Sequence, residues 1–352
     1  MTADPAIAGP PPLLDVQDLR VEFATHGGTV QAVRGVSFSL EAGRTLAIVG
    51  ESGCGKSVTV QALMGLVPMP PGRLTGGRAR LRGRDILSGT RIDGREFRGR
   101  EIGMIFQDPM TSLNPTMTIG RQIAETLEVH RGWSRGQALA RAVELLEMVR
   151  IPEAAERARQ YPFEFSGGML QRAMIAMAIA CEPAILIADE PTTALDVTIQ
   201  AQVLDLMQEL QRTHGTAIIL ITHDLAVVAR MADDVAVMYA GQIVEKGSVD
   251  DVFARSAHPY TVGLRAAIPG NAPGARQRLR PIEGSPPDLF APPAGCAYAA
   301  RCPHAMRVCG LAEPQPFSTG AGHFGKCWLH HEAVPGGAAR VAAAGPALEE
   351  AP

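Results

Sequence analysis

At residues 50–57 the chain has the stretch Gly50-Glu51-Ser52-Gly53-Cys54-Gly55-Lys56-Ser57, which directly follows the apolar run Leu46-Ala47-Ile48-Val49. The stretch fits the pattern G-x-x-x-x-G-K-S/T between a strand and a helix, which is the context of a P-loop. Its glycines let successive backbone N–H groups turn toward one anion, and the N-terminus of the following helix adds its dipole. We expect Lys56 to reach the β- and γ-phosphates of ATP and Ser57 to ligate Mg²⁺, with Val58 completing the phosphate-binding segment. Lysine occurs only at positions 56, 246 and 326, so a lysine in this loop is hard to attribute to chance.

A second apolar strand is predicted at 184–188, and it ends in two carboxylates, Asp189 and Glu190. Adjacent strand residues point to opposite faces, so the two carboxylates are expected to have different tasks. Asp189 would hold Mg²⁺ through water, and Glu190 would polarise the attacking water as general base. An acidic pair at a strand end is common by itself, and the P-loop is what makes this pair a candidate site.

A second anion-binding element is predicted where Phe165-Ser166-Gly167-Gly168-Met169 begins a helix. A hydroxyl and two glycines at a helix N-terminus can bind an anion, although they also make an ordinary helix cap. One chain does not need two such sites for one triphosphate. We therefore expect Ser166, Gly167 and Gly168 to bind the γ-phosphate held by another subunit's P-loop, in a head-to-tail dimer.

The composition indicates a globular protein and argues against a nucleic-acid partner. The chain has 352 residues, 46% of them hydrophobic, and a net charge of −3 from 33 basic and 36 acidic side chains. Proteins that mainly bind nucleic acid are usually basic. The longest comparable apolar run covers residues 173–181, which is far short of the roughly 20 residues that a membrane span needs. No secretory signal is recognisable, so we expect a cytoplasmic location and cysteines that are thiols or metal ligands, not disulfides.

The patterning divides the chain into segments. Residues 1–12 are expected to be a disordered tail, 13–267 the main domain, 268–334 a Pro- and Gly-rich extension, and 335–352 a second disordered tail. Within the main domain, helical spacing at 119–130 and 137–149 predicts a helical subdomain over about 95–165. The other expected elements are strands at 19–23, 36–40, 46–49, 184–188 and 217–221, helices at 56–66, 167–181 and 196–214, a short helix from 224, and a hairpin at 240–241.

Together these motifs resemble the nucleotide-binding subunit of ABC transporters, over about residues 13 to 330. Three further motifs carry the resemblance: Met104-Ile105-Phe106-Gln107-Asp108, Thr193-Ala194-Leu195-Asp196 and Ile221-Thr222-His223-Asp224. The resemblance implies an α/β fold, the P-loop NTPase ABC cassette, in which a RecA-like core carries an antiparallel β subdomain and a helical subdomain. A loop-rich C-terminal extension with cysteines follows.

The same resemblance implies roles for four more residues. Gln107 contacts Mg²⁺ or the attacking water, His223 lies near the γ-phosphate, and Asp196 lies at the dimer seam. Phe23 stands where the family has an aromatic residue stacked on adenine. A Phe in an alternating strand is as often part of the core, so both interpretations of Phe23 stay open.

Finer features are similar to the oligopeptide/dipeptide importer branch of this family. They are the segments 106–115, 161–169 and 189–198, together with His258-Pro259-Tyr260 and Arg301-Cys302-Pro303-His304-Ala305. This similarity implies an ATPase that powers import of di- and oligopeptides at the cytoplasmic face of the inner membrane. Two transmembrane permease subunits are the implied direct partners, and an extracytoplasmic solute-binding protein is an indirect one.

The signature Phe-Ser-Gly-Gly-Met departs from the commoner Leu-Ser-Gly-Gly-Gln. It is similar to the D-type ATPase of the branch, which pairs with a different, F-type ATPase, so a heterodimer with a second ATP-binding subunit is expected. Met169 cannot make the hydrogen bonds of glutamine. Whether both composite sites hydrolyse ATP equally is therefore left open.

Four cysteines lie in the extension, in the order Cys296-x5-Cys302-x6-Cys309-x17-Cys327. Four thiolates suit a 4Fe-4S cluster or Zn²⁺, but the spacing matches neither the usual zinc ribbons nor the common ferredoxin patterns. The spacing alone leaves a cluster, zinc and free thiols as alternatives. D-type subunits carry a similar cysteine set associated with an iron–sulfur cluster, so the resemblance implies a 4Fe-4S cluster, with zinc as the alternative.

Other ABC-type proteins are alternatives to a transporter. A soluble DNA-maintenance ATPase usually has a long coiled-coil arm or a zinc module in its core, but the predicted helical subdomain lacks sustained heptads. A translation factor of ABC type normally has two cassettes, whereas this chain has one P-loop. Nickel or another small solute stays an alternative cargo, because permeases and binding proteins select what is imported.

Overall fold

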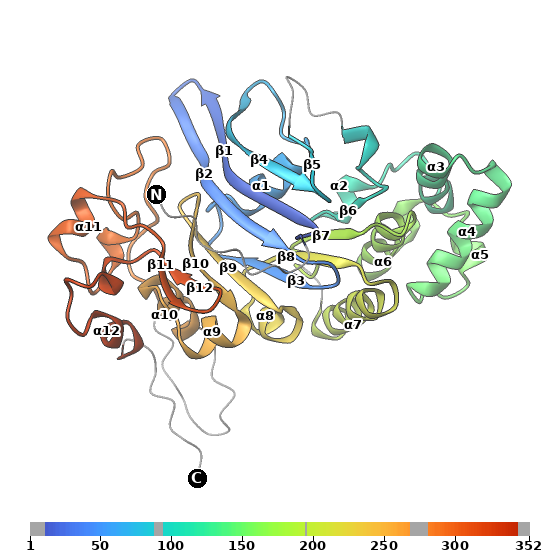
Figure 1. The fold of residues 1–352 in the computed structure, drawn as a ribbon. Coiled ribbons are helices and arrows are strands. Elements are labelled where there is room, and N and C mark those ends of the chain that lie inside the picture. The colour runs from blue at the N-terminus through green and yellow to red at the C-terminus, as the bar shows by residue number, and fades with distance from the viewer. Residues whose placement is uncertain (1–10, 88–93, 194–195, 268–280, 344–352) are drawn as a thin grey trace, which may run out of the picture.

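Two β-sheets form the centre of the molecule, and helices cover them (Figure 1). The computed structural model describes residues 11–87, 94–193, 196–267 and 281–343. The smaller sheet is antiparallel and contains β1 (Leu14–Thr25), β2 (Gly28–Leu40), β4 (Gly72–Leu81) and β5 (Arg84–Asp85). The larger sheet contains β3 (Thr45–Val49), β6 (Ile102–Ile105), β7 (Ile185–Asp189), β8 (Ala217–Thr222), β9 (Asp234–Tyr239), β10 (Gln242–Ser248), β11 (Phe317–Gly320) and β12 (His323–Gly325).

The α-helices lie on both faces of the larger sheet and at its two ends. They are α1 (Lys56–Leu63), α2 (Pro109–Ser112), α3 (Ile119–Arg131), α4 (Arg135–Met148), α5 (Ala154–Arg157), α6 (Gly167–Ile179), α7 (Val197–His214), α8 (Leu225–Met231), α9 (Val249–Ala254), α10 (Pro259–Ala266), α11 (Arg307–Leu311) and α12 (Gly337–Ala343). No helix in the described part of the chain combines the length and the apolar character that crossing a bilayer requires.

The larger sheet has the order β11-β12-β10-β9-β3-β8-β7-β6, and the five strands from β9 to β6 run parallel to one another, whereas β10 is antiparallel to β9. Every residue of β3, β7 and β8 is buried, as expected for parallel strands covered on both faces. On one face, α1 fills the space between the two sheets, where Val60 and Leu63 share a core with residues of β1, β2 and β8. On the other face lie α7 and α8 (Figure 1).

The range of about 95–165, predicted as a helical subdomain, contains helices and one strand of the larger sheet. Helices α3, α4 and α5 pack with α6 around one apolar core. Residues 102–105, inside the predicted range of about 95–165, form β6 and pair with β7 of the larger sheet. Four residues are too few for periodicity to distinguish a buried strand from a helix, so the sequence did not predict this strand, and the boundary at about 95 stays a prediction.

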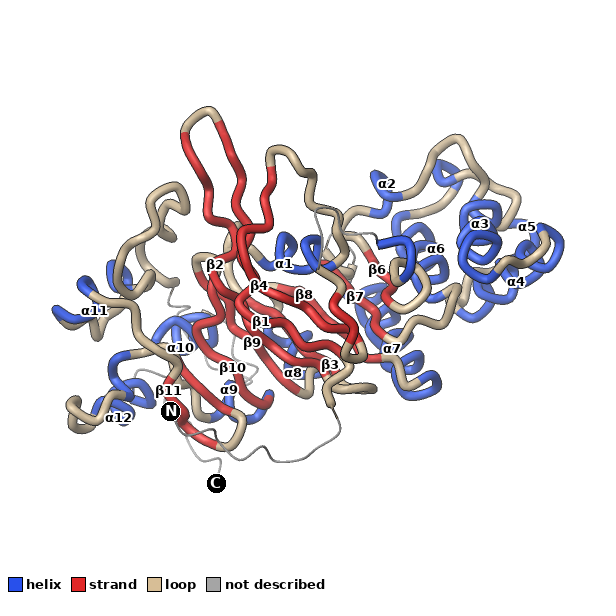
Figure 2. The backbone as a smooth tube through the Cα atoms, turned by 45° about the horizontal axis from the view of Figure 1, so that its top comes forward, coloured by secondary structure: helices blue, strands red, loops and turns tan. Residues whose placement is uncertain are grey.

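The C-terminal extension continues the larger sheet and does not form a separate lobe. Strand β12 pairs with β10, and β11 pairs with β12. Figure 2 shows α11 and α12 at the end of the sheet opposite α3, α4 and α5. Residues 337–343, predicted to be disordered, form α12, because Val341 packs on Val262 and Leu329. The predicted tails at 1–10 and 344–352 lie outside the described residues.

Candidate functional site

The P-loop connects β3 to α1, and its two outer glycines are required by close backbone contacts. Gly50 has a φ of +154°, and a Cβ there would lie 2.1 Å from the carbonyl oxygen of Met238. Gly55 has a φ of +101°, and a Cβ there would lie 2.3 Å from the carbonyl oxygen of Ala32. Lys56 is 5% exposed, and its Nζ donates to the carbonyl oxygens of Gly50 at 2.8 Å and Glu51 at 3.0 Å. The loop is therefore closed around Lys56, with Ser52 and Gly53 exposed at its tip.

Ser57 and Asp189 meet below the loop, as the sequence predicts for two residues that share one cation. The Ser57 hydroxyl donates to Asp189 Oδ1 at 2.9 Å. Burial raises the pKa of the Asp189 carboxyl above its usual value, and the hydrogen bond from Ser57 opposes this shift. A hydroxyl and a carboxylate are oxygen donors of the kind Mg²⁺ prefers, so these residues fit the ion.

Glu190 is contacted by side chains from two other segments and by Thr193 of its own segment. Gln107 Nε2 donates to Glu190 Oε2 at 3.0 Å, and Thr193 Oγ1 donates to the same oxygen at 2.9 Å. His223 Nδ1 lies 3.5 Å from Glu190 Oε1. Glu190 has a φ of +47°, which is unusual for a residue with a side chain and is typical of strained positions at functional sites.

The topology explains why these residues converge. Strands β3, β8, β7 and β6 are neighbours and parallel, so their carboxyl ends meet at one edge of the sheet. The P-loop follows β3, His223 follows β8, Glu190 follows β7, and Gln107 follows β6. Sequence reasoning assigned no role to Thr193, although a hydroxyl three residues after Glu190 is a usable signal.

The predicted second anion site lies at the N-terminus of α6. Ser166 caps this helix by accepting a hydrogen bond from the N–H of Met169 at 3.4 Å. Asp196 caps α7 in the same way through the N–H of Ile199 at 2.9 Å, and Gly168 lies close to the Ile199 side chain. Among the described residues, no hydrogen bond or ion pair joins 166–168 to the P-loop of the same chain. The roles of Ser166, Gly167, Gly168 and Asp196 in a dimer stay predictions.

Phe23 lies near the end of β1, where it is half-buried beside Gly72. Its ring packs at the margin of the core that contains α1. This position agrees with either interpretation of the residue, so its contact with adenine stays a prediction.

Glu51, which follows Gly50 in the P-loop, forms hydrogen bonds with two residues to which sequence reasoning assigned no role. Glu51 accepts two hydrogen bonds from Arg301 of the extension, and its N–H donates to the hydroxyl of Tyr260. Both partners lie in segments that resemble the peptide-importer branch, but neither segment carried a signal for contact with the P-loop. Their separation from Glu51 along the chain hides the contact from any sequence pattern.

None of the four cysteines of the extension forms a disulfide with another described cysteine. Burial raises the pKa of Cys296 to about 11 and of Cys327 to about 12, and the other cysteines nearby add to the shift. Within the described ranges, no group of three or more His, Cys, Asp or Glu side chains is arranged to hold a metal ion. The predicted iron–sulfur site therefore gains no support from the arrangement of its ligands.

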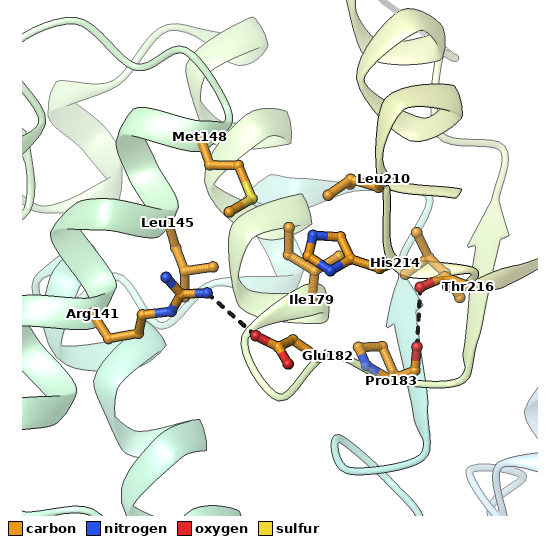
Figure 3. A pocket seen from close by; sticks show the side chains of 10 residues that line it. Arg141, Leu145, Met148, Ile179, Glu182, Pro183, Leu210, His214 and Thr216 are labelled. Atoms are coloured by element: carbon orange, nitrogen blue, oxygen red, sulfur yellow. Dashed lines mark hydrogen bonds and ion pairs between the residues drawn. The ribbon is translucent and has the colours of Figure 1, made fainter. Parts of the chain in front are cut away.

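A pocket elsewhere in the molecule contains none of the predicted site residues (Figure 3). It lies between α4, α6 and α7 and is lined mainly by apolar side chains, among them Leu145 and Leu210. Arg141 pairs with Glu182 at its edge at 3.4 Å. None of the residues that line the pocket belongs to the P-loop.

Two family models match the chain. The model described as "ABC transporter" matches residues 33–193, and the model described as "Oligopeptide/dipeptide transporter, C-terminal region" matches residues 244–309. The first covers the P-loop, Gln107 and Glu190, and the second covers Arg301 and three of the four cysteines of the extension.

Full-length relatives and solved structures show the same similarity. The oligopeptide transport ATP-binding protein OppD of Bacillus subtilis is 56% identical over 92% of this chain and 90% of its own length. The dipeptide transport ATP-binding protein DppD of the same organism is 54% identical over 91% of this chain and 95% of its own. Among solved structures, the ATP-binding cassette MJ0796, a dimer bound to ADP and Pi, matches with a TM-score of 0.60 and 25% identity. That match covers 67% of this chain and 98% of the other.

Proposed function

Because this chain belongs to the ATP-binding subunits of oligopeptide and dipeptide ABC transporters, we propose that the residues around Glu190 carry out the ATP hydrolysis that powers peptide import. One observation carries the proposal. A P-loop lysine, a partly buried Ser57–Asp189 pair and the Glu190 carboxylate with three polar neighbours lie at the carboxyl ends of adjacent parallel strands. This combination suits phosphoryl transfer to water, which requires positioning and charge stabilisation more than covalent chemistry.

Each residue has a distinct task in this proposal. Lys56 and the N–H groups of the P-loop bind the β- and γ-phosphates, and Ser57 and Asp189 hold Mg²⁺, which neutralises phosphate charge when bound. The Glu190 carboxylate accepts the proton of the attacking water. Gln107 and Thr193 orient that carboxylate through their hydrogen bonds to Oε2, and His223 is free to face the γ-phosphate because its side chain is 63% exposed.

Glu190→Gln tests the assignment of the general base. The amide keeps the shape of the side chain but cannot accept a proton, so we expect hydrolysis to slow by roughly 100-fold or more while MgATP still binds. The measurement is ATPase turnover of the assembled transporter together with MgATP binding by the full chain. Glu182 is an exposed carboxylate outside the site, so the Glu182→Gln variant is the control and should hydrolyse ATP at the normal rate. Near-normal turnover of Glu190→Gln would contradict the assignment.

The partners follow from the signature at Ser166. The γ-phosphate held by a second, different ATP-binding subunit is its proposed ligand, so that two such subunits form a head-to-tail heterodimer. The dimer binds two transmembrane permeases at the cytoplasmic face of the membrane, and its closure changes their conformation. An extracytoplasmic binding protein delivers the peptide to the permeases. Peptide cargo is supported by the names of similar proteins, which are described as oligopeptide or dipeptide transport ATP-binding proteins.

A 4Fe-4S cluster on Cys296, Cys302, Cys309 and Cys327 belongs to the same proposal. Four cysteines in one segment supply the number and type of ligands that such a cluster uses, and this similarity to D-type subunits is what supports the cluster. Protein purified without oxygen is expected to contain iron and acid-labile sulfide, and Cys302→Ser should lose both. Cys181 is a buried cysteine outside the extension, so the Cys181→Ser variant is the control and should keep the iron and sulfide. Stoichiometric zinc in colourless protein would contradict the cluster.

A further inference from the structure

Glu51, the residue that follows Gly50 in the P-loop, is held at both its backbone and its side chain. Its N–H donates to Tyr260 Oη of α10 at 2.8 Å. Its carboxylate accepts from Arg301 Nη1 at 2.8 Å and from Arg301 Nη2 at 3.0 Å, so the pair is bidentate. A bidentate pair fixes the direction of the carboxylate as well as its distance. The exposed tip of the loop is thus attached at its base to two distant segments of the chain.

Arg301 is itself firmly held. Its side chain is 5% exposed. Its Nε donates to the carbonyl oxygen of Glu283 at 2.9 Å, its Nη2 also donates to that of Ile282 at 3.2 Å, and its Nη1 also contacts Tyr239 Oη at 3.2 Å. All three guanidinium nitrogens are therefore engaged, and the rigid fork cannot move without the extension.

An aromatic cluster joins the three elements that meet beneath Glu51. The ring centroids of Tyr239 (β9) and Tyr260 (α10) are 4.5 Å apart, and Tyr298 of the extension lies 5.3 Å from the first and 5.4 Å from the second. Tyr239 and Tyr260 are almost fully buried. Strand β9, helix α10 and the extension therefore pack together and support the P-loop.

Glu51 also links this support to the phosphate-binding lysine, because its carbonyl oxygen accepts from Lys56 Nζ at 3.0 Å. A loop that is already ordered loses less conformational entropy when it binds phosphates than a loop that must be ordered first. We propose that Arg301 is a positioning residue for the P-loop, and that through it the C-terminal extension sets the affinity of this chain for nucleotide. Arg301 acts through Glu51 and touches neither nucleotide nor water in this role.

A double-mutant cycle on the full chain tests the proposal. The probe is a fluorescent ATP analogue with Mg²⁺, and the variants are Arg301→Met, Glu51→Gln and the two combined. Each single change is expected to weaken affinity about tenfold, and the double variant should bind no more weakly than the weaker single variant, because coupled residues are not additive. Arg301→Lys should bind at an intermediate level, because it retains the charge but not the fork. In the assembled transporter, Arg301→Met should raise KM for ATP with little change in kcat.

Arg307→Met, at an exposed position of the same extension, is the matched control and should bind like the unchanged chain. Equal affinity of Arg301→Met and Arg307→Met would overturn the proposal, as would losses that multiply in the double variant. If Arg301→Met does not fold by circular dichroism, the cycle of Arg301→Lys with Glu51→Gln decides the question by the same criteria. The inference rests on the proposed nucleotide site, and failure of the unchanged chain to bind the analogue would contradict that site instead.

Discussion

Gly50 and Gly53 lie three residues apart in one loop, yet the structure constrains them differently. A Cβ at Gly50 would meet the Met238 carbonyl oxygen of β9 at 2.1 Å, and backbone of a central strand cannot move aside. Gly53 has a φ of +77°, but nothing lies within 4 Å of a Cβ there. At the scale of the residue, then, Gly50 is fixed by packing and by its dihedral angle, and Gly53 by its dihedral angle alone.

Gly50→Ala is therefore expected to lower the free energy of unfolding by about 3 kcal/mol, the upper range for overpacking. Gly53→Ala is the control and should cost about 1 kcal/mol, from backbone strain alone. Urea unfolding of the nucleotide-free full chain measures both. An equal decrease in the free energy of unfolding for the two variants would mean that the backbone of β9 shifts to make room for the added methyl group.

At the scale of the element, the extension depends on one buried carboxylate of β10. Glu245 is fully buried and accepts from the N–H groups of Ala257 at 2.7 Å and His258 at 2.9 Å. His323 Nε2 of β12 lies 3.0 Å from the same carboxylate. Burial lowers the pKa of His258 to about 3, so that ring is neutral and its Nδ1 accepts from the N–H of Tyr260. Glu245 thus joins β10, the start of α10 and β12.

Glu245→Ala leaves two buried N–H groups and His323 without their acceptor. We expect it to lower the free energy of unfolding by about 3 kcal/mol and to expose the extension to protease before the core unfolds. Glu313→Ala is the control, because that carboxylate is 38% exposed and its loss should cost under about 1 kcal/mol. Urea unfolding and limited proteolysis measure the two effects. Retained protection of β11 and β12 would show that strand pairing alone holds the extension.

At the scale of the whole molecule, the proposed dimer implies that the chain presents half of a composite site. The P-loop and Glu190 both lie within it, whereas among the described residues no hydrogen bond or ion pair joins Ser166 or Gly168, at the start of α6, to that P-loop. In the proposed dimer, a partner with its own P-loop would complete such a site, and ATP would hold the two subunits together until hydrolysis.

Tagged Glu190→Gln, expressed in the native host and solubilised gently with MgATP, should therefore retain its partners. Mass spectrometry is expected to identify two membrane permeases and a second, different ATPase. Lys56→Ala is the control, because a chain that does not bind MgATP cannot be trapped in the closed dimer. Recovery of the chain alone, or with nucleic acid and repair proteins, would contradict the transport partners.

The sequence by itself determined the ABC cassette fold, and it predicted which residues form the nucleotide site. Short-range rules suffice there: a continuous apolar run predicts a buried strand, and Gly50 to Ser57 must follow one. Asp189 and Glu190 end a second such strand, and parallel strands bring their carboxyl ends to one edge of the sheet. The predicted fold is confirmed by the sheet order and by the similarity to solved cassettes.

Only the tertiary structure decided how the extension is attached. Residues 102–105 became a strand and 337–343 a helix because neighbours far along the chain bury them, and periodicity over so few residues carries no such information. The contact between Glu51 and Arg301 spans 250 residues of chain. A hydrogen bond needs its partners within about 3 Å in space. No spacing in the sequence measures that distance, so the support of the P-loop became visible only in the folded molecule.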